Sequence, residues 1–251
     1  MPEHFRALVV ILVLAGVVFY MARRPASDLI PAHDFTRRRN LWFVLTVLAF
    51  VSHSFWIYVA VTTIILTLAR KREHNPVALF FILAFLVPPA QARIPGFGLM
   101  NYFFDLNYVR LLSLCVLLPA FLSLRRQSDT QGFGRTWPDK FLAVYLVLTS
   151  LLLLRETTVT DTMRQTLYQF TDVFLPYYVA SRALKNINDF KDALLGFVLA
   201  AMVMSLIGFF EFARGWLLYS ALIGAMGMQW EMSSYLSRGG LLRASVTTGQ
   251  A

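Results

Sequence analysis

Apolar segments, each bounded by basic residues, follow one another from Leu8 to Ala213 of this 251-residue chain. Hydrophobic residues make up 57% of the sequence and charged residues only 15%, against roughly 25% charged residues in an average soluble domain. The mean hydropathy is +0.59. This pattern predicts an all-α integral membrane protein, a polytopic bundle of transmembrane helices.

We expect about seven or eight membrane segments in a single domain over residues 1–251, some of them short or kinked, because a helix needs about 20 residues to cross the bilayer core. Residues 214–251 are expected to form an extracytoplasmic loop after the last segment. The expected segments are 7–22, 41–51, 55–69, 77–90, 108–124, 141–154, 167–184 and 193–213.

Residues 41–69 allow two topologies. Two apolar runs are separated by Ser52–Ser54, and basic residues lie at both outer ends, at 37–39 and 70–72. A single long helix would put one basic run outside, which the positive-inside rule disfavours. A hairpin turning near His53 would keep both runs in the cytoplasm, and we favour it over the single helix.

With the hairpin, the inner loops are 22–40, 70–76, 125–140 and 182–192, and they contain 15 of the 23 Lys and Arg residues, including all four lysines. Membrane insertion and attraction to anionic lipid account for most of the net charge of +9. Membrane lipid is therefore an expected partner, and nucleic acid is not.

Eight basic residues are expected on the outer side, and all of them are arginines: Arg6, Arg93, Arg110, Arg155, Arg164, Arg214, Arg238 and Arg243. Guanidinium groups bind phosphate oxygens in pairs, so this set suits a phosphate-bearing substrate. The alternative is chance with structural ion pairing, because arginine outnumbers lysine 19 to 4 in the whole chain. The single cysteine, Cys115, and the absence of GxxxxGK[ST], HExxH and CxxC patterns give no reason to expect a metal or a cofactor.

Three polar groups interrupt the apolar pattern. The first, Arg93–Arg110, is expected to be an outer interfacial loop or a short re-entrant segment, and it is either an aromatic belt or a contact surface for lipid or sugar. The second places Gln165, Gln169 and Asp172 on one face of a helix that Pro176 should bend or break. Asp172 is there either for a structural hydrogen bond, with Arg164 as one candidate partner, or for a functional site.

The third group follows the last segment and is the best candidate site. Glu211 and Arg214 lie one turn apart, and Trp216, Trp230, Glu231, Arg238, Gly239, Gly240 and Arg243 come after them. Glycine beside arginine lets the backbone approach an anionic group closely. An ordinary i, i+3 ion pair between Glu211 and Arg214 is the alternative.

Several stretches resemble the N-terminal half of the bacterial O-antigen ligase and O-antigen polymerase superfamily. They are FTRRRNLWFVLTVLAFVSHSFW, NPVALFFILAFLVPPAQARIPGFG, NYFFDLNYVRLL, FLPYYVASRAL and RGGLLRASVTTGQA. The resemblance implies a multi-pass protein of the bacterial inner membrane that transfers glycan from an undecaprenyl-pyrophosphate carrier to lipid A core, a protein hydroxyl or a growing polysaccharide, without a metal or cofactor. Arg243 would help to hold the pyrophosphate. Val246 stands where the family often has glycine, and Ala251 where it often has proline.

From the outer arginines and the polar stripe we expect the carrier site to include Arg238, Arg214, Arg164, Asp172 and Arg110 as well. The resemblance implies that the catalytic base belongs to a C-terminal half beyond Ala251. None of the four histidines is an obvious base; His53, in the early turn, is expected to be structural. We therefore expect a ligase-like chain that is inactive alone, with a complementary half or envelope assembly proteins as partners. The alternatives are a carrier-binding or transport subunit with a site at Asp172, and a scaffold subunit.

Overall fold

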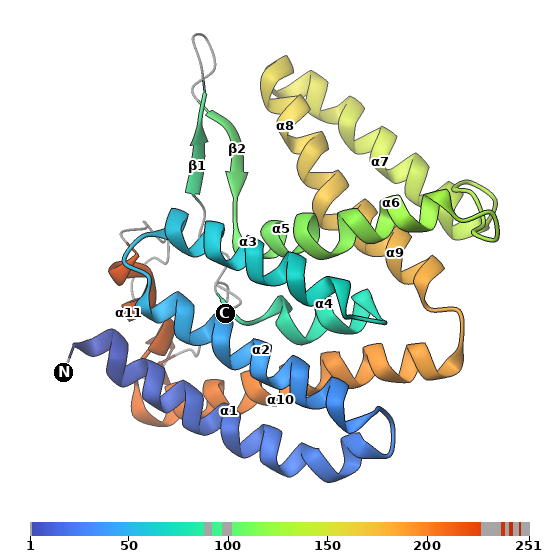
Figure 1. Ribbon diagram of the computed structural model, residues 1–251. Helices are drawn as coiled ribbons and strands as arrows, with labels where there is room; N and C mark the ends of the chain where they lie inside the picture. The colour runs from blue at the N-terminus through green and yellow to red at the C-terminus, as the bar shows by residue number, and fades with distance from the viewer. Residues whose placement is uncertain are drawn as a thin grey trace.

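The computed structural model describes residues 2–87, 92–96, 102–226, 237–238, 241–242 and 246. Most of them are helical (Figure 1). The helices are α1 (Glu3–Ser27), α2 (Ala32–Val51), α3 (Phe55–Lys71), α4 (Pro76–Ala84), α5 (Tyr108–Leu112), α6 (Leu118–Arg126), α7 (Trp137–Glu156), α8 (Val159–Gln169), α9 (Leu175–Ala183), α10 (Ile187–Arg214) and α11 (Leu218–Ala225). The π-helical turns are η1 (Ser113–Leu117) and η2 (Phe170–Phe174), and the strands are β1 (Ala92–Pro95), β2 (Tyr102–Leu106), β3 (Ser237–Arg238) and β4 (Leu241–Leu242).

The predicted all-α fold class is confirmed, and the helices are consistent with a membrane protein. Within the described residues, four helical stretches are long and apolar enough to cross a bilayer: Glu3–Ser27, Tyr108–Arg126, Trp137–Arg155 and Ile187–Arg214. Other expected segments are shorter, since α3 has 17 residues and α4 has 9. The figure of seven or eight segments therefore stays a prediction.

Capping residues fix where several helices begin. Thr136 and Asp139 exchange side-chain and backbone hydrogen bonds at the start of α7, and Asn186 and Asp189 do the same at the start of α10. The Asn75 side chain accepts hydrogen bonds from the first turn of α4, which opens with Pro76. These groups satisfy backbone N–H donors that a helix leaves unpaired.

The stretch 41–69 forms two helices, and α2 begins before it, at Ala32. The chain turns at Ser52–Ser54, and α3 runs back beside α2 (Figure 1). Arg37 and Arg38, near the start of α2, both donate hydrogen bonds to the Glu73 carboxylate just beyond α3. The two basic runs therefore lie at the same end of the pair, as a hairpin requires.

The closest helix packing joins α10 to α4. Gly196 of α10 lies against the backbone of Ala78 in α4, where an added Cβ would be 2.7 Å from the Ala78 carbonyl oxygen. On its other side α10 packs along α1, which also contacts α2 and α11. In Figure 1 these helices form the lower part of the molecule.

The helix α7 lies apart from this bundle and packs chiefly against α8 (Figure 1). Only 6% of its apolar stretch is buried inside the protein. Apolar side chains such as Phe141, Val144 and Leu151 are exposed around it. In a membrane these side chains have acyl chains as their solvent, so the exposure carries no hydrophobic penalty.

The bundle formed by the described helices has two ends, and we call them the His53 end and the Glu73 end after one residue at each. At the His53 end, the start of α1 meets the end of α10, because the Trp216 indole donates to the Glu3 carboxylate. At the Glu73 end, Arg38 binds both Glu73 and Asp192, close to the start of α10. Segments that the charge pattern assigned to the inner side, 70–76 and 182–192, thus lie together at the Glu73 end.

Candidate functional site

The Arg93–Arg110 segment, expected to be a loop or a re-entrant segment, contains an antiparallel pair of strands, β1 and β2, that projects from the helices (Figure 1). The register places Arg93 opposite Asp105, with 3.7 Å between the Arg93 Nε and the Asp105 carboxylate. The hairpin leads directly into α5, where the Asn107 side-chain oxygen accepts a hydrogen bond from the Arg110 backbone N–H. It lies at the His53 end, since Tyr108 packs beside Tyr58 at the start of α3.

Arg110 joins this segment to the second polar group of the sequence. Its Nη2 lies 2.9 Å from the Asp172 Oδ2, and its Nε lies 3.0 Å from the same oxygen. Its Nη1 donates to the Asp105 carbonyl oxygen at 2.7 Å. All three nitrogens of the Arg110 guanidinium therefore have acceptors within the protein.

Tyr168 provides a flat surface beneath this ion pair. The Arg110 guanidinium carbon lies 3.7 Å from the centre of the Tyr168 ring, a cation–π contact. The Tyr168 hydroxyl oxygen accepts a hydrogen bond from the Asp105 backbone N–H at 2.8 Å. The tyrosine thus holds both the hairpin and the arginine against α8.

A second tyrosine, Tyr102, forms cation–π contacts with two further arginines. The Tyr102 ring lies 5.0 Å from the Arg93 guanidinium and 3.9 Å from that of Arg164. Arg164 also forms an ion pair with Asp161, one turn earlier on α8. Arg93 is different, because its side chain is 74% exposed and its contact with Asp105 is loose. We call this group the arginine–tyrosine lip: Arg93, Tyr102, Asp105, Arg110, Arg164, Tyr168 and Asp172.

The residues of the polar stripe predicted in the second polar group contact two different neighbouring segments. Asp172 lies on η2 and faces Arg110, whereas the Gln169 side chain accepts a hydrogen bond from the Thr149 hydroxyl on α7. The wider π-helical turn at Phe170–Phe174 changes the angular spacing between these residues. This turn ends beside Pro176, which supplies no backbone N–H to the helix. Asp172 pairs with Arg110 and not with Arg164, the candidate partner considered from sequence.

In the C-terminal group, the Glu211 carboxylate lies inside the protein. Glu211 is fully buried and accepts hydrogen bonds from the backbone N–H groups of Leu218, at 3.0 Å, and Val246, at 2.9 Å. It ties the start of α11 and Val246 to the end of α10. The Val246 φ of 45° lies in the left-handed region, which β-branched residues rarely adopt.

The other predicted site residues are on α10, on β3 or outside the described residues. Arg214 is exposed at the end of α10, followed by Gly215 in the left-handed conformation that commonly ends helices. Arg238 lies on β3, paired with Leu241. Arg243 lies outside the described residues, as do Trp230, Glu231, Gly239 and Gly240.

Sequence reasoning missed a pocket at the His53 end. His4, from the start of α1, and His53, from the α2–α3 turn, line a cavity of about 410 Å³ together with Glu3 and α11. The two histidines are far apart in the chain, and no spacing signal joins them. Within the part of the chain that is described, no group of three His, Cys, Asp or Glu residues is arranged to hold a metal ion.

The arginines expected to bind substrate thus have two different environments. Arg110 and Arg164 are held by carboxylates and tyrosine rings, so they shape the lip. Arg93 and Arg214 are exposed at the same end of the protein and have room for an external anion. No protein-family model, curated protein or solved structure matches the chain.

Proposed function

We propose that the protein binds an undecaprenyl-pyrophosphate-linked glycan at the arginine–tyrosine lip, as the N-terminal part of an O-antigen ligase-like glycosyltransferase in the bacterial inner membrane. In this proposal the His53 end is extracytoplasmic and the protein crosses the membrane seven or eight times. The observation that supports it most is the exposed Arg93 guanidinium, fixed over Tyr102 beside two arginines that are already paired.

The electrostatics of the lip suit a diphosphate. Each arginine of the lip has one carboxylate partner, so the lip is stable without a ligand. The three pairs are Arg93–Asp105, Arg110–Asp172 and Arg164–Asp161. A diphosphate competes best for Arg93, whose carboxylate contact is the longest of the three at 3.7 Å. Guanidinium groups held by aromatic rings keep their orientation and form paired hydrogen bonds to phosphate oxygens.

Such a site would stabilise the leaving group of glycan transfer. The acceptor hydroxyl oxygen bonds to the anomeric carbon, the bond from that carbon to the phosphate oxygen breaks, and the pyrophosphate departs with the electron pair. Oriented cations stabilise the charge that develops on it. A base must take the hydroxyl proton. The contribution proposed for this chain is carrier binding, and transfer requires the complementary catalytic part implied by the resemblance.

Photocrosslinking tests the proposal. The purified chain in liposomes is incubated with a photoreactive polyprenyl-pyrophosphate, irradiated and mapped by peptide mass spectrometry. We expect labelled peptides from 92–110 and 159–174, weaker labelling in Arg93→Gln, and loss of labelling by competition with unlabelled carrier. Arg243→Ala should also weaken labelling, as the family resemblance implies.

Arg125→Gln is the matched control, because Arg125 is an exposed arginine in the last turn of α6, at the Glu73 end and away from the lip. It should leave the labelling unchanged. Equal labelling of the wild type and Arg93→Gln, or equal competition by a polyprenyl alcohol without phosphate, would contradict a pyrophosphate site at the lip.

A second candidate function, transport of the lipid-linked glycan, is favoured by a different observation. The π-helical turns η1 and η2 interrupt two neighbouring helices and contact each other, and Asp172 lies on η2. Interrupted transmembrane helices line the substrate sites of many transporters. This function predicts that Asp172→Asn abolishes movement of a fluorescent polyprenyl-pyrophosphate across liposomes while Arg243→Ala leaves it intact; carrier binding without movement would exclude it.

A further inference from the structure

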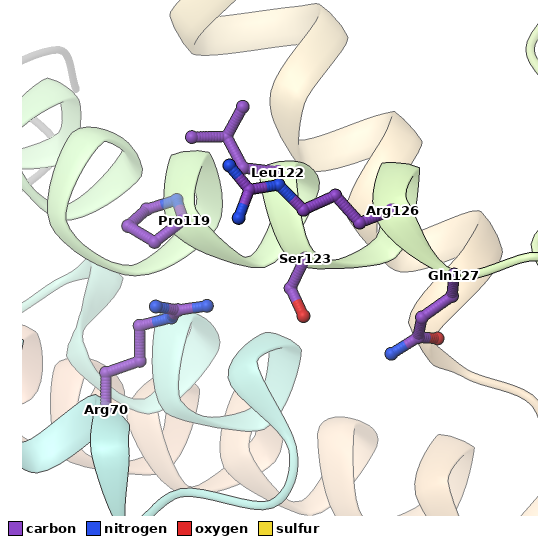
Figure 2. A pocket seen from close by; sticks show the side chains of 6 residues that line it. All are labelled: Arg70, Pro119, Leu122, Ser123, Arg126 and Gln127. Carbon is purple, nitrogen blue, oxygen red and sulfur yellow. The ribbon is translucent and has the colours of Figure 1, made fainter.

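A pocket at the Glu73 end, far from the proposed carrier site, is lined by two arginines. It encloses about 520 Å³ between α3 and α6 and is lined by Arg70, Pro119, Leu122, Ser123, Arg126 and Gln127 (Figure 2). Arg70 comes from the end of α3, and Arg126 is the last residue of α6. The two helices therefore each bring an arginine to the same opening.

Neither arginine has a counter-ion among the residues that the structure describes. Among residues 2–87, 92–96 and 102–226, no carboxylate or carbonyl oxygen forms an ion pair or a hydrogen bond with the Arg70 or Arg126 side chain. The nearby carboxylate of Glu73 is already bound by Arg37 and Arg38. The pocket lining thus carries two positive charges and no negative one.

The rest of the lining fits a lipid better than a free anion. Pro119 and Leu122 form an apolar wall on α6, and the Leu122 side chain is exposed to the surroundings of the helix. Ser123 and Gln127 add hydrogen-bonding side chains to the lining (Figure 2). The pocket therefore combines an apolar wall for an acyl chain with a cationic, hydrogen-bonding part for a headgroup.

We propose that this pocket binds the phosphate of an anionic phospholipid, with the headgroup between Arg70 and Arg126 and one acyl chain along Leu122. Both arginines lie at helix ends, which is the depth at which lipid phosphates are found in a bilayer. The site is separate from the arginine–tyrosine lip, which lies at the other end of α5 and α6. A bound lipid would hold α3 against α6 where the described protein has no ion pair between them.

Native mass spectrometry of the full chain in detergent tests the proposal. Phosphatidylglycerol is titrated into delipidated protein, with phosphatidylethanolamine as the neutral lipid and glycerol-1-phosphate as the free phosphate. We expect one phosphatidylglycerol to be retained at low lipid concentration. Each of Arg70→Gln and Arg126→Gln should weaken its binding by about fivefold, the contribution of one arginine near an anionic lipid surface.

Two variants keep the result interpretable. Arg125→Gln removes an equal charge from the same helix outside the pocket and should bind phosphatidylglycerol like the wild type. Arg70→Lys keeps the charge and should retain most of the binding, which separates lost binding from lost folding. Equal weakening in Arg125→Gln, equal retention of phosphatidylethanolamine, or retention of glycerol-1-phosphate at the same concentrations would overturn the lipid site.

Discussion

Arg110 and Asp172 form an ion pair between α5 and η2 that joins two segments 62 residues apart, with 2.9 Å between Arg110 Nη2 and Asp172 Oδ2. The Arg110 side chain is 10% exposed and that of Asp172 is 34% exposed, so solvent screens the pair only in part. This contact turns the hairpin and α8 into one surface, and it is the main structural reason why the lip exists.

Breaking this pair should destabilise the protein. Asp172→Asn and Arg110→Gln are each expected to lower the free energy of unfolding by about 1–3 kcal/mol, because each leaves a partly buried charge without its counter-ion. The double variant should lose less than the sum of the two. Thermal unfolding in detergent measures this, and Asp161→Asn, which breaks a pair within one helix whose carboxylate is 42% exposed, should cost less than either change. Strict additivity of the two single changes would show that the pair does not couple the segments.

Gly196→Ala should weaken the packing between α10 and α4. Its Cβ would lie 2.7 Å from the Ala78 carbonyl oxygen, which belongs to a backbone that cannot rotate away. We expect a loss of about 1–3 kcal/mol, the usual cost of overpacking. Gly16→Ala is the control in α1, since nothing lies within 4 Å of the added carbon. Melting temperatures that fall equally in both variants would refute the close contact.

Glu73 should make stability sensitive to acid. Burial by itself raises the pKa of the Glu73 carboxyl, but the hydrogen bonds and charges of Arg38 and Arg37 outweigh it and lower the pKa below its ordinary value of 4.5. The unfolded chain therefore takes up the proton first, and the stabilisation is present above pH 4.5 and lost as the pH falls through the lower, folded value. The difference in melting temperature between wild type and Glu73→Gln should be largest near neutral pH and shrink below pH 4.5. A difference that grows on acidification would contradict this.

Glu211→Ala should release Val246 and the start of α11 from the end of α10. The substitution leaves the N–H groups of Leu218 and Val246 without their carboxylate acceptor, at about 1–3 kcal/mol for each buried donor. Limited proteolysis should cut the chain after α11 faster, and the melting temperature should fall. Glu211→Gln keeps one acceptor oxygen and should be intermediate. Unchanged proteolysis in Glu211→Ala would mean that this carboxylate does not hold Val246.

Cysteine labelling tests the proposed topology. In a Cys115→Ala background, His53→Cys and Ser233→Cys should react with an impermeant maleimide from outside the cell membrane, and Asp129→Cys should react only after the membrane is opened. His53 and Asp129 are both exposed, so accessibility does not limit the comparison. Reaction of Ser233→Cys from the cytosolic side alone would place the predicted carrier arginines away from the carrier glycan.

The sequence alone determined the helical membrane class, because the apolar runs of α1, α7 and α10 are local properties of their own residues. The break at Ser52–Ser54 was also visible in it. Local spacing did not identify the hydrogen-bonding partners of the polar side chains. It placed Gln165 and Gln169 on one helix face with Asp172, and Glu211 one turn from Arg214. The structure instead joins Asp172 to Arg110 and Glu211 to Val246.

Only the tertiary structure decided these pairs, since the hydrogen-bonding partner of a buried charge is chosen by which backbones pack together and not by distance along the chain. The same holds for the pocket that brings His4 to His53 and for the opening that brings Arg70 to Arg126. Hydropathy is a sum over neighbouring residues and can be read from sequence, whereas the pairing of a few polar side chains depends on the packing of helices such as α3 against α6, which no local pattern encodes.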